Sequence, residues 1–490
     1  MIATNRNRVR QPGGHWWRGW GAGVLAGSLM AGAVAERFTG PWDIDALCQV
    51  PEYEWGKEVE DVREVFYAAL PYLGKPTRVF AWLGIPESDE PVPGMLLIHG
   101  AGQNARRDWV RYWMDRGYAA LSMDLDGQSS WGPLPDGGPR FATIPYFGPF
   151  PHGDLKEGWI YHAVADVMLA HSLLAAQPGV DPERIGINGV SLGSTLVCTV
   201  AGVDARLRAA APVYGAAFLH EGGYWQERIR FMDCHRAAEW MSLLDASVYL
   251  PGVTCPILFQ NGATDRFTPP DAYHHSWAVC GGERTLALRP ELNHGNFWRW
   301  PWGGIEVNLF LDHHLRGGPA PPLIQVIEET ESNVVCAVTS DLPVVAVHFA
   351  YTTDLGPWSK RQWHEEPLAV DPARFTVSLP EARPLWAFVM VAVETRPKFN
   401  GWFSTPYFFR DYPESPSRII LDEVTLDSNH LVVRGRKPFG LRILFEKSTD
   451  LCHWEWHFSH IEPTIEFEVT LPLGGGDYRF LRARKREPME

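Results

Sequence analysis

The chain has 490 residues, more than a single compact core usually holds, so two or three domains are expected. Hydrophobic residues make up 45% and charged residues 21%, a balance typical of folded globular proteins rather than disordered ones. The 44 Lys and Arg against 58 Asp and Glu give a net charge of −14, which disfavours nucleic acid and anionic membranes as partners and leaves small neutral molecules open.

The first 35 residues have the pattern of an export signal. Four arginines between Arg6 and Arg18 form a basic region, residues 22–33 are small and apolar, and Ala33-Val34-Ala35 fits a cleavage site. We therefore expect residues 1–35 to be a signal peptide cleaved near Ala35 and the mature protein to be secreted or periplasmic. An uncleaved anchor or a disordered tail is the alternative. No other segment reaches the ~20 apolar residues of a membrane span.

Strand-like and helix-like segments alternate from about residue 75 to 316. This alternation predicts that residues 36–316 form an α/β domain, in which a mostly parallel sheet carries helices on both faces. The predicted strands are 77–83, 94–98, 119–124, 184–188, 209–213, 256–260 and 284–288. The predicted helices are 104–116, 161–176, 191–203 and 270–279.

Two segments of this region are rich in aromatic residues. Residues 126–159 contain glycine, proline and aromatics with no clear periodicity, and long loops of this kind are usually functional when they are ordered. Residues 215–249 look helical. Tyr146 from the first segment and Trp225 from the second are candidate walls of a substrate cleft, with core packing as the alternative.

A serine stands where a strand must turn sharply into a helix. Gly189-Val190-Ser191-Leu192-Gly193 follows the predicted strand 184–188 and opens an apolar helix. Glycines two residues either side of the serine permit a tight turn that exposes its hydroxyl, the arrangement called a nucleophile elbow. A serine hydroxyl becomes a good nucleophile only when a base accepts its proton and a third group orients that base. Ser191 is therefore the candidate nucleophile.

Two downstream residues fit the roles of acid and base. Asp265 lies in the loop after strand 256–260, and His294 follows strand 284–288. Since ligands bind at the carboxyl edge of a parallel sheet, the ends of these strands should bring Ser191, His294 and Asp265 together. Taken singly, Asp265 could be a helix cap and His294 an ordinary loop histidine. Trp298, four residues after His294, is a further candidate for substrate contact.

An oxyanion hole is expected from two backbone segments. His99-Gly100-Ala101-Gly102 follows strand 94–98, and its Ala101 or Gly102 amide would supply one donor. The amide of Leu192, directly after the nucleophile, would supply the other. His99 precedes the elbow, so we expect it to support the loop rather than act as the base.

The pattern changes after residue 316. Gly317-Gly318-Pro319-Ala320-Pro321-Pro322 is typical of a linker, and short alternating strands then predict a β-sandwich over 323–410. Pro413-Glu414-Ser415-Pro416 precedes a small β-rich domain over 417–486. Neither part contains a nucleophile–base pattern, so packing or accessory roles are expected. The predicted strands of the β-sandwich are 333–339, 344–352, 374–379, 386–394 and 401–409.

These motifs carry a family resemblance. His99-Gly100-Ala101-Gly102, Asp124-Leu125-Asp126-Gly127, the Gly189–Gly193 elbow, Asp265 and Asn293-His294-Gly295 together resemble the acetylxylan esterase and dienelactone-hydrolase-like branch of the α/β-hydrolases. The resemblance covers roughly residues 50 to 316. It implies an α/β-hydrolase fold and a serine esterase that cleaves small acyl esters from sugars and related alcohols. Dienelactone hydrolases carry a cysteine nucleophile, so Ser191 makes an esterase the closer implication.

The predicted activity is therefore hydrolysis of carboxylic esters, acetyl esters of carbohydrates above all, through an acyl-enzyme on Ser191. No cofactor or metal is implied, because this chemistry is complete without one and the seven cysteines show no metal-ligand spacing. A peptidase of the prolyl-oligopeptidase type is one alternative, although such enzymes usually carry a β-propeller before the catalytic domain. A non-catalytic protein that binds polysaccharide or cell envelope is the other.

Overall fold

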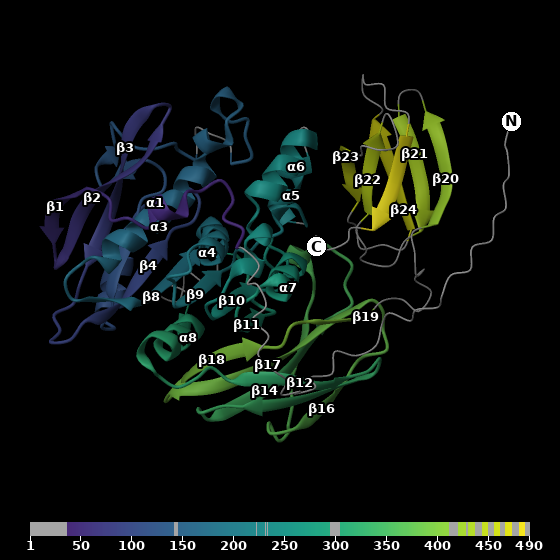
Figure 1. Cartoon of the computed structure of the whole chain (residues 1–490). Helices are drawn as coiled ribbons and strands as arrows, with labels where there is room; N and C mark the ends of the chain where they lie inside the picture. The colour runs from purple at the N-terminus through teal and green to yellow at the C-terminus, as the bar shows by residue number, and fades with distance from the viewer. Residues whose placement is uncertain are drawn as a thin grey trace, which may run out of the picture. The chain divides into compact units, whose positions relative to one another are not determined.

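The computed structural model describes residues 37–141, 146–221, 223–230, 232, 234–294 and 304–410, together with six strands between residues 420 and 485 (Figure 1). The expected signal peptide, residues 1–35, and Trp298 lie outside the described residues. None of the described helices is long and apolar enough to cross a membrane.

A nine-stranded sheet organises the first half of the chain (Figure 1). Its order is β1-β2-β3-β5-β4-β8-β9-β10-β11; the pairs from β1 to β5 are antiparallel, and the pairs from β5 to β11 are parallel. The strands are β1 (Tyr53–Val59), β2 (Val62–Tyr72), β3 (Lys75–Gly84), β4 (Val92–Ile98), β5 (Ala119–Met123), β8 (Val180–Val190), β9 (Ala209–Val213), β10 (Ile257–Gly262) and β11 (Arg284–Arg289). The mostly parallel sheet agrees with the expected α/β architecture, and β1 and β2 extend it beyond the predicted strands.

Helices cover both faces of this sheet. Residues Leu96 and Ile98 of β4 belong to a core shared with α3 and α4, whereas Met95 and Leu97 belong to a core shared with α2 and α8. Successive side chains of a strand point to opposite faces, so one buried strand serves two cores. The helices of this region are α1 (Ile44–Leu47), α2 (Arg107–Met114), α3 (Trp159–Ala175), α4 (Leu192–Val203), α7 (Pro270–Val279) and α8 (Gly304–Arg316).

The two aromatic-rich segments are held by packing. The first contains the small hairpin β6 (Gln128–Ser129) and β7 (Gly132–Pro133), and its Tyr146 and Phe147 belong to the α3–α4 core. The second contains α5 (Gly223–Arg230) and α6 (Cys234–Leu243), in line with its helical pattern. Single-turn helices occupy Pro151–Gly153, Leu155–Glu157, Leu219–Glu221, Ala246–Val248, Leu250–Gly252 and Trp358–Lys360.

Antiparallel strands follow residue 322. One sheet has the order β12-β13-β16, and a second has β15-β14-β17-β18 with β19 also on β17. Their strands are β12 (Leu323–Glu329), β13 (Asn333–Thr339), β14 (Val344–Thr352), β15 (His364–Pro367), β16 (Phe375–Ser378), β17 (Leu385–Arg396), β18 (Phe399–Ser404) and β19 (Phe408–Arg410). Val334 of the first sheet and Val389 of the second belong to one apolar core, as in a sandwich, whereas Phe388 and Met390 of β17 belong to the core that contains α3 and α4.

Two further three-stranded sheets follow, with the orders β20-β21-β24 and β23-β22-β25. Their strands are β20 (Ile420–Asp427), β21 (His430–Arg436), β22 (Ile443–Ser448), β23 (Glu455–His460), β24 (Glu466–Pro472) and β25 (Phe480–Lys485). In the described part of the chain the cysteines at 48, 198, 280 and 336 are free thiols.

Candidate active site

Ser191 lies in a strained turn between β8 and α4. Its backbone has φ +56° and ψ −123°, a left-handed conformation that is rare for a residue with a side chain. The backbones on either side leave no room for larger residues, because a Cβ on Gly193 would lie 2.4 Å from the carbonyl oxygen of Ile98. A Cβ on Gly189 would lie 2.6 Å from the carbonyl oxygen of Gly193. The two glycines therefore let the strand, the helix and the neighbouring loop meet at the serine.

Ser191, His294 and Asp265 form one hydrogen-bonded chain. The Ser191 Oγ lies 2.8 Å from His294 Nε2, and His294 Nδ1 lies 2.8 Å from Asp265 Oδ2. The imidazole thus connects the hydroxyl to the carboxylate, as the order of these residues along the chain predicts. Asp265 is fully buried, whereas the His294 side chain keeps 18% of its surface exposed. The arrangement holds a histidine at the surface with an acid behind it.

The loops that carry the acid and the base are tied together. Asp265 Oδ1 accepts hydrogen bonds from the amides of Phe267 at 2.7 Å and Thr268 at 3.1 Å, so its other oxygen faces His294. Thr264 Oγ1 donates to the Leu292 carbonyl at 2.8 Å. These contacts fix the Asp265 carboxylate from one side, which leaves the imidazole a single orientation to adopt.

The predicted oxyanion loop lies against the elbow. A Cβ on Gly100 would be only 3.1 Å from the Ser191 Cβ, so the loop backbone passes directly beside the nucleophile. Ala101 and Gly102 follow on the exposed part of this loop, and Gly102 has φ +69°. Leu192, which carries the second predicted amide donor, begins α4 with its side chain buried. The three predicted donor residues thus lie on the two segments that meet at Ser191.

His99 supports this loop, as expected. Its Nδ1 is 2.8 Å from the Gly100 carbonyl oxygen and its Nε2 accepts from the Leu125 amide at 3.0 Å. Both ring nitrogens are therefore occupied by backbone, and burial lowers the pKa of the imidazole. A neutral His99 with the proton on Nδ1 satisfies both contacts. The residue joins the oxyanion loop to the loop after β5.

Aromatic side chains enclose His294. The ring of Phe267 lies 4.4 Å and that of Tyr214 4.7 Å from the imidazole, measured between centroids. Neither was a predicted site residue. The sequence offers a signal for Phe267, because it stands two residues after Asp265 in the same loop. Tyr214 follows β9 and reaches the site because β9 pairs with β8. Together they restrict the imidazole and shield it from bulk water.

Trp225 and Tyr146 belong to one aromatic cluster near this wall. The Trp225 ring lies 6.3 Å from Phe267 and 6.0 Å from Tyr146. Trp225 is partly exposed, whereas Tyr146 keeps only 3% of its surface and also packs on Trp159 and Trp240. Trp225 therefore keeps part of its ring at the surface, and Tyr146 packs against it from the core.

A sequence model described as acetyl xylan esterase (AXE1) matches residues 49–300, more than half of the chain. The chain belongs to this family. The esterase is therefore a carboxylic ester hydrolase of the α/β-hydrolase superfamily, as the motifs predicted.

Solved structures with a similar fold include two named acetyl xylan esterases. The enzyme from Paenibacillus sp. R4 is 19% identical with a TM-score of 0.46, covering 56% of this esterase and 92% of that chain. Acetyl xylan esterase 1 from Thermoanaerobacterium sp. JW/SL YS485 is 18% identical with a TM-score of 0.43, covering 54% and 93%. A putative dienelactone hydrolase from Klebsiella pneumoniae subsp. pneumoniae is 19% identical with a TM-score of 0.33, covering 48% and 88%.

Proposed function

We propose that the esterase removes small acyl groups, acetyl above all, from hydroxyls of carbohydrates or related alcohols through an acyl-enzyme on Ser191. The observation that carries this proposal is the hydrogen-bonded chain from Ser191 through His294 to Asp265 at a strained turn. The membership of the acetyl xylan esterase family supports the acetyl group and the carbohydrate. No cofactor enters the proposed mechanism.

In the first half-reaction, Ser191 Oγ attacks the ester carbonyl carbon while His294 Nε2 takes the hydroxyl proton. Asp265 keeps the other imidazole proton on Nδ1 and stabilises the imidazolium that forms. The carbonyl oxygen becomes an oxyanion, which the amides of Leu192 and of Ala101 or Gly102 stabilise; one such donor is worth about 10²–10³ in kcat. The C–O bond to the alcohol then breaks, and His294 gives its proton to the leaving oxygen.

In the second half-reaction, water replaces the alcohol. His294 removes a proton from the water as the water oxygen attacks the acyl carbon, and a second tetrahedral oxyanion forms in the same place. Its collapse breaks the bond to Ser191 Oγ, which recovers its proton from His294. The products are a carboxylic acid and the free enzyme, so the hydroxyl, imidazole and carboxylate return to their starting states.

The experiment compares wild type with Ser191→Ala on 4-nitrophenyl acetate. We expect kcat to fall by about 10⁶-fold, to the level of background hydrolysis, because the nucleophile is lost. Ser359→Ala, an exposed serine on the β-sandwich, is the matched control. Unchanged hydrolysis by Ser191→Ala would show that the proposed nucleophile is wrong.

Acyl and alcohol preference are tested separately. Wild type is assayed on nitrophenyl esters of increasing chain length, on acetylated xylan with acetate release as the readout, and on a panel of peptides. The proposal predicts that acetyl esters are the best short substrates and that acetylated xylan releases acetate. Cleavage of peptides without release of acetate from xylan would favour the peptidase instead.

We also propose that residues 1–35 direct export and are removed near Ala35, so that the esterase acts outside the cytoplasm. The basic region, the short apolar stretch and Ala33-Val34-Ala35 support this. N-terminal sequencing of the protein recovered from periplasm or medium should begin at or near Glu36. An intact Met1 on protein in the membrane fraction would instead show an uncleaved anchor.

A further inference from the structure

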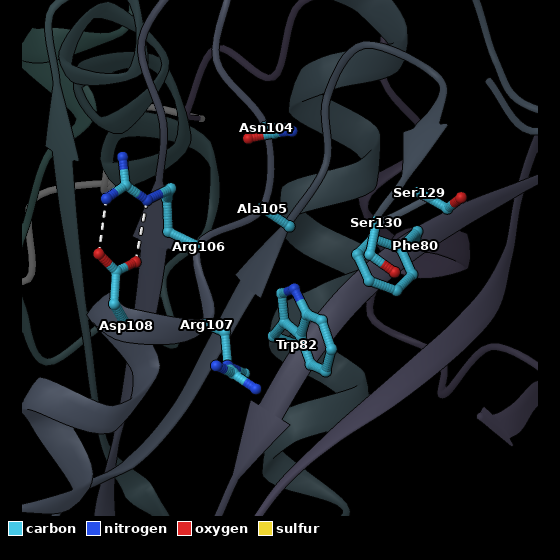
Figure 2. Close-up of a pocket in the computed structure, with 9 residues that line it drawn as sticks. All are labelled: Phe80, Trp82, Asn104, Ala105, Arg106, Arg107, Asp108, Ser129 and Ser130. Atoms are coloured by element: carbon cyan, nitrogen blue, oxygen red, sulfur yellow. Dashed lines mark hydrogen bonds and ion pairs between the residues drawn. The ribbon is translucent and has the colours of Figure 1, made fainter. Parts of the chain in front are cut away.

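A pocket borders the start of α2, at the end of the loop that begins with His99, and the proposed chemistry makes no use of it (Figure 2). It has a volume of about 330 Å³ and is lined by Phe80 and Trp82 of β3, by residues 104–108, which include the first residues of α2, and by Ser129 and Ser130 of the β6–β7 hairpin. Ligand pockets commonly combine an aromatic floor with a few convergent polar groups, and this pocket has both.

The charged groups of the pocket are already paired. Arg106 holds Asp108 with two hydrogen bonds of 2.9 and 2.6 Å, which Figure 2 draws as dashed lines. Arg107 lies 3.4 Å from Glu60 and 6.0 Å from the centroid of the Trp82 ring. With its cations neutralised and a chain of net charge −14, the pocket favours a neutral ligand over an anion.

An exposed tryptophan follows the pocket-lining Ser130 in the chain. Ser130 and Trp131 are the two turn residues between β6 and β7, and Trp131 keeps 76% of its surface exposed. Isolated exposed aromatics are ordinary on protein surfaces. This one is held in place, because its amide donates to Ser129 Oγ at 3.2 Å and the Lys57 ammonium lies 4.7 Å from its ring centroid. A fixed, open aromatic face is a stacking platform for an apolar ring face.

The β6–β7 hairpin is held in place by hydrogen bonds to two buried carboxylates. The Ser130 hydroxyl donates to the buried Glu64 carboxylate at 2.8 Å, and the Gln128 amide donates to Asp124 Oδ1 at 2.7 Å. A site fixed before binding loses little entropy when a ligand arrives. Because Trp131 directly follows the pocket-lining Ser130, the hairpin surface that carries both residues is fixed before a ligand binds.

The surface is also close to the nucleophile. Gly100 touches Ser191, and Asn104 follows only four residues later on the same loop. Four residues span at most about 14 Å, so one extended ligand can reach from the pocket to the ester position. The Arg106 amide donates to Ser122 Oγ at 3.0 Å, which ties the pocket end of the loop to β5.

From these contacts we propose that Trp131 and the adjoining pocket form a glycan subsite that binds an uncharged pyranose unit beside the one carrying the ester. The sugar's C–H face stacks on Trp131, while its hydroxyls reach the Asn104 amide and the serines of the hairpin. This inference rests on the proposed function in that the ester is a carbohydrate ester, but binding at the subsite needs no acyl group.

Binding of unacetylated xylohexaose and cellohexaose to the full-length protein tests the subsite by isothermal titration calorimetry. At least one should bind the wild type, and Trp131→Ala should weaken that binding at least ten-fold, with Trp131→Phe between the two. Phe399→Ala removes another exposed aromatic, on β18, and should leave the affinity unchanged. Because Trp131 is so exposed, its replacement should not unfold the protein, which circular dichroism checks.

The result that overturns the subsite is distinct from the one that overturns the ester chemistry. No binding of either oligosaccharide, or equal affinity in wild type and Trp131→Ala, would rule the subsite out. Unacetylated oligosaccharides carry no ester for Ser191 to attack, so the binding result does not depend on the ester chemistry. Hydrolysis that persists in Ser191→Ala would instead contradict the proposed nucleophile.

Discussion

At the scale of single residues, the Asp265 carboxylate decides which nitrogen of His294 carries a proton. Its Oδ1 is committed to the amides of Phe267 and Thr268, so an asparagine at 265 would keep its oxygen there and turn its NH₂ toward His294 Nδ1. The imidazole would then accept at Nδ1 and hold its proton on Nε2, where it could no longer accept one from Ser191.

Asp265→Asn should therefore abolish most activity without unfolding the protein. We expect kcat on 4-nitrophenyl acetate to fall by about 10⁴-fold because the base has the wrong tautomer. Thermal unfolding should stay close to that of the wild type, since both loop amides keep their acceptor. A loss of less than ten-fold would mean that Asp265 does not orient the base.

Asp124 gives a second prediction at this scale, on stability and pH. It is buried, its Oδ1 accepts from the amides of Asp126 and Gln128, and burial raises the pKa of its carboxyl to about 6. An unfolded aspartate titrates near pH 3.9, so between about pH 4 and 6 the native state holds a proton that the unfolded state loses. Wild-type stability contributed by this group is therefore lost as pH rises through that window.

Asp124→Asn removes this dependence while keeping an acceptor for both amides. The free energy of unfolding of the variant, relative to that of the wild type, should rise by up to about 3 kcal/mol from pH 4 to pH 8. This is the free energy equivalent to the difference between the native and unfolded pKa values of Asp124. Urea unfolding midpoints of both proteins at several pH values measure it. Asp89→Asn, at an exposed position, is the control. A difference between Asp124→Asn and wild type that stays constant with pH would contradict the assignment.

At the scale of elements, α7 links the loop of Asp265 to the β-sandwich. Asp271, in the first turn of this helix, accepts hydrogen bonds from Tyr407 Oη at 2.5 Å and from Trp358 Nε1 at 3.1 Å. Burial and the nearby Asp271 charge raise the pKa of Tyr407, so the phenol stays protonated and donates. Arg361 stacks on Trp358 and Trp386 in the same region.

Tyr407→Phe should loosen this link. It removes one donor to Asp271 and should lower the free energy of unfolding by about 1–3 kcal/mol, the range for losing a hydrogen bond to a charged carboxylate that is partly buried. Tyr53→Phe on β1 removes the hydroxyl of a tyrosine that is 40% exposed and should change stability little. Equal melting temperatures of the two variants would show that the contact does not stabilise α7.

Elements with a strong local pattern were predictable, and those defined by their neighbours were not. The bounds of β9, α7, β13 and β14 equal those predicted from apolar runs and helical periodicity. β1 lies at the sheet edge and contains only exposed and partly buried residues, so it offered no apolar run. The predicted strand 401–409 is divided between β18 and β19, because Pro406 cannot donate to the ladder.

The candidate site divides in the same way. The order of Ser191, Asp265 and His294 along the chain was enough to predict that they meet. Tyr214 at His294 was not predictable, because its position depends on β9 pairing with β8 and on its own φ of +44°. The proposed role of Trp131 was not predictable either, because the pocket beside its hairpin has walls from three separate segments.

At the scale of the whole molecule, polar contacts join the β-sandwich to the hydrolase sheet. The Leu288 amide of β11, six residues before His294, donates to Ser404 Oγ at 3.0 Å. Glu306 on α8 is buried and connects two sheets: its Oε1 accepts from the Trp402 amide at 2.8 Å and its Oε2 from Gln260 Nε2 at 3.1 Å. The sandwich strand β18 therefore helps to hold the strand that leads to the base.

Glu306 allows this coupling to be tested with a matched pair of variants. Glu306→Ala leaves the Trp402 amide and the Gln260 side chain without an acceptor and should cost about 2–4 kcal/mol of stability. Glu306→Gln keeps an oxygen for Trp402, and its NH₂ can donate to the Gln260 oxygen, which has no partner among the residues that the structure describes. Because burial raises the pKa of Glu306 by penalising its charge, a neutral amide also avoids that penalty. Calorimetric melting should rank Glu306→Gln near wild type and Glu306→Ala clearly below it. Equal melting of the two variants would mean that Glu306 does not couple the sheets.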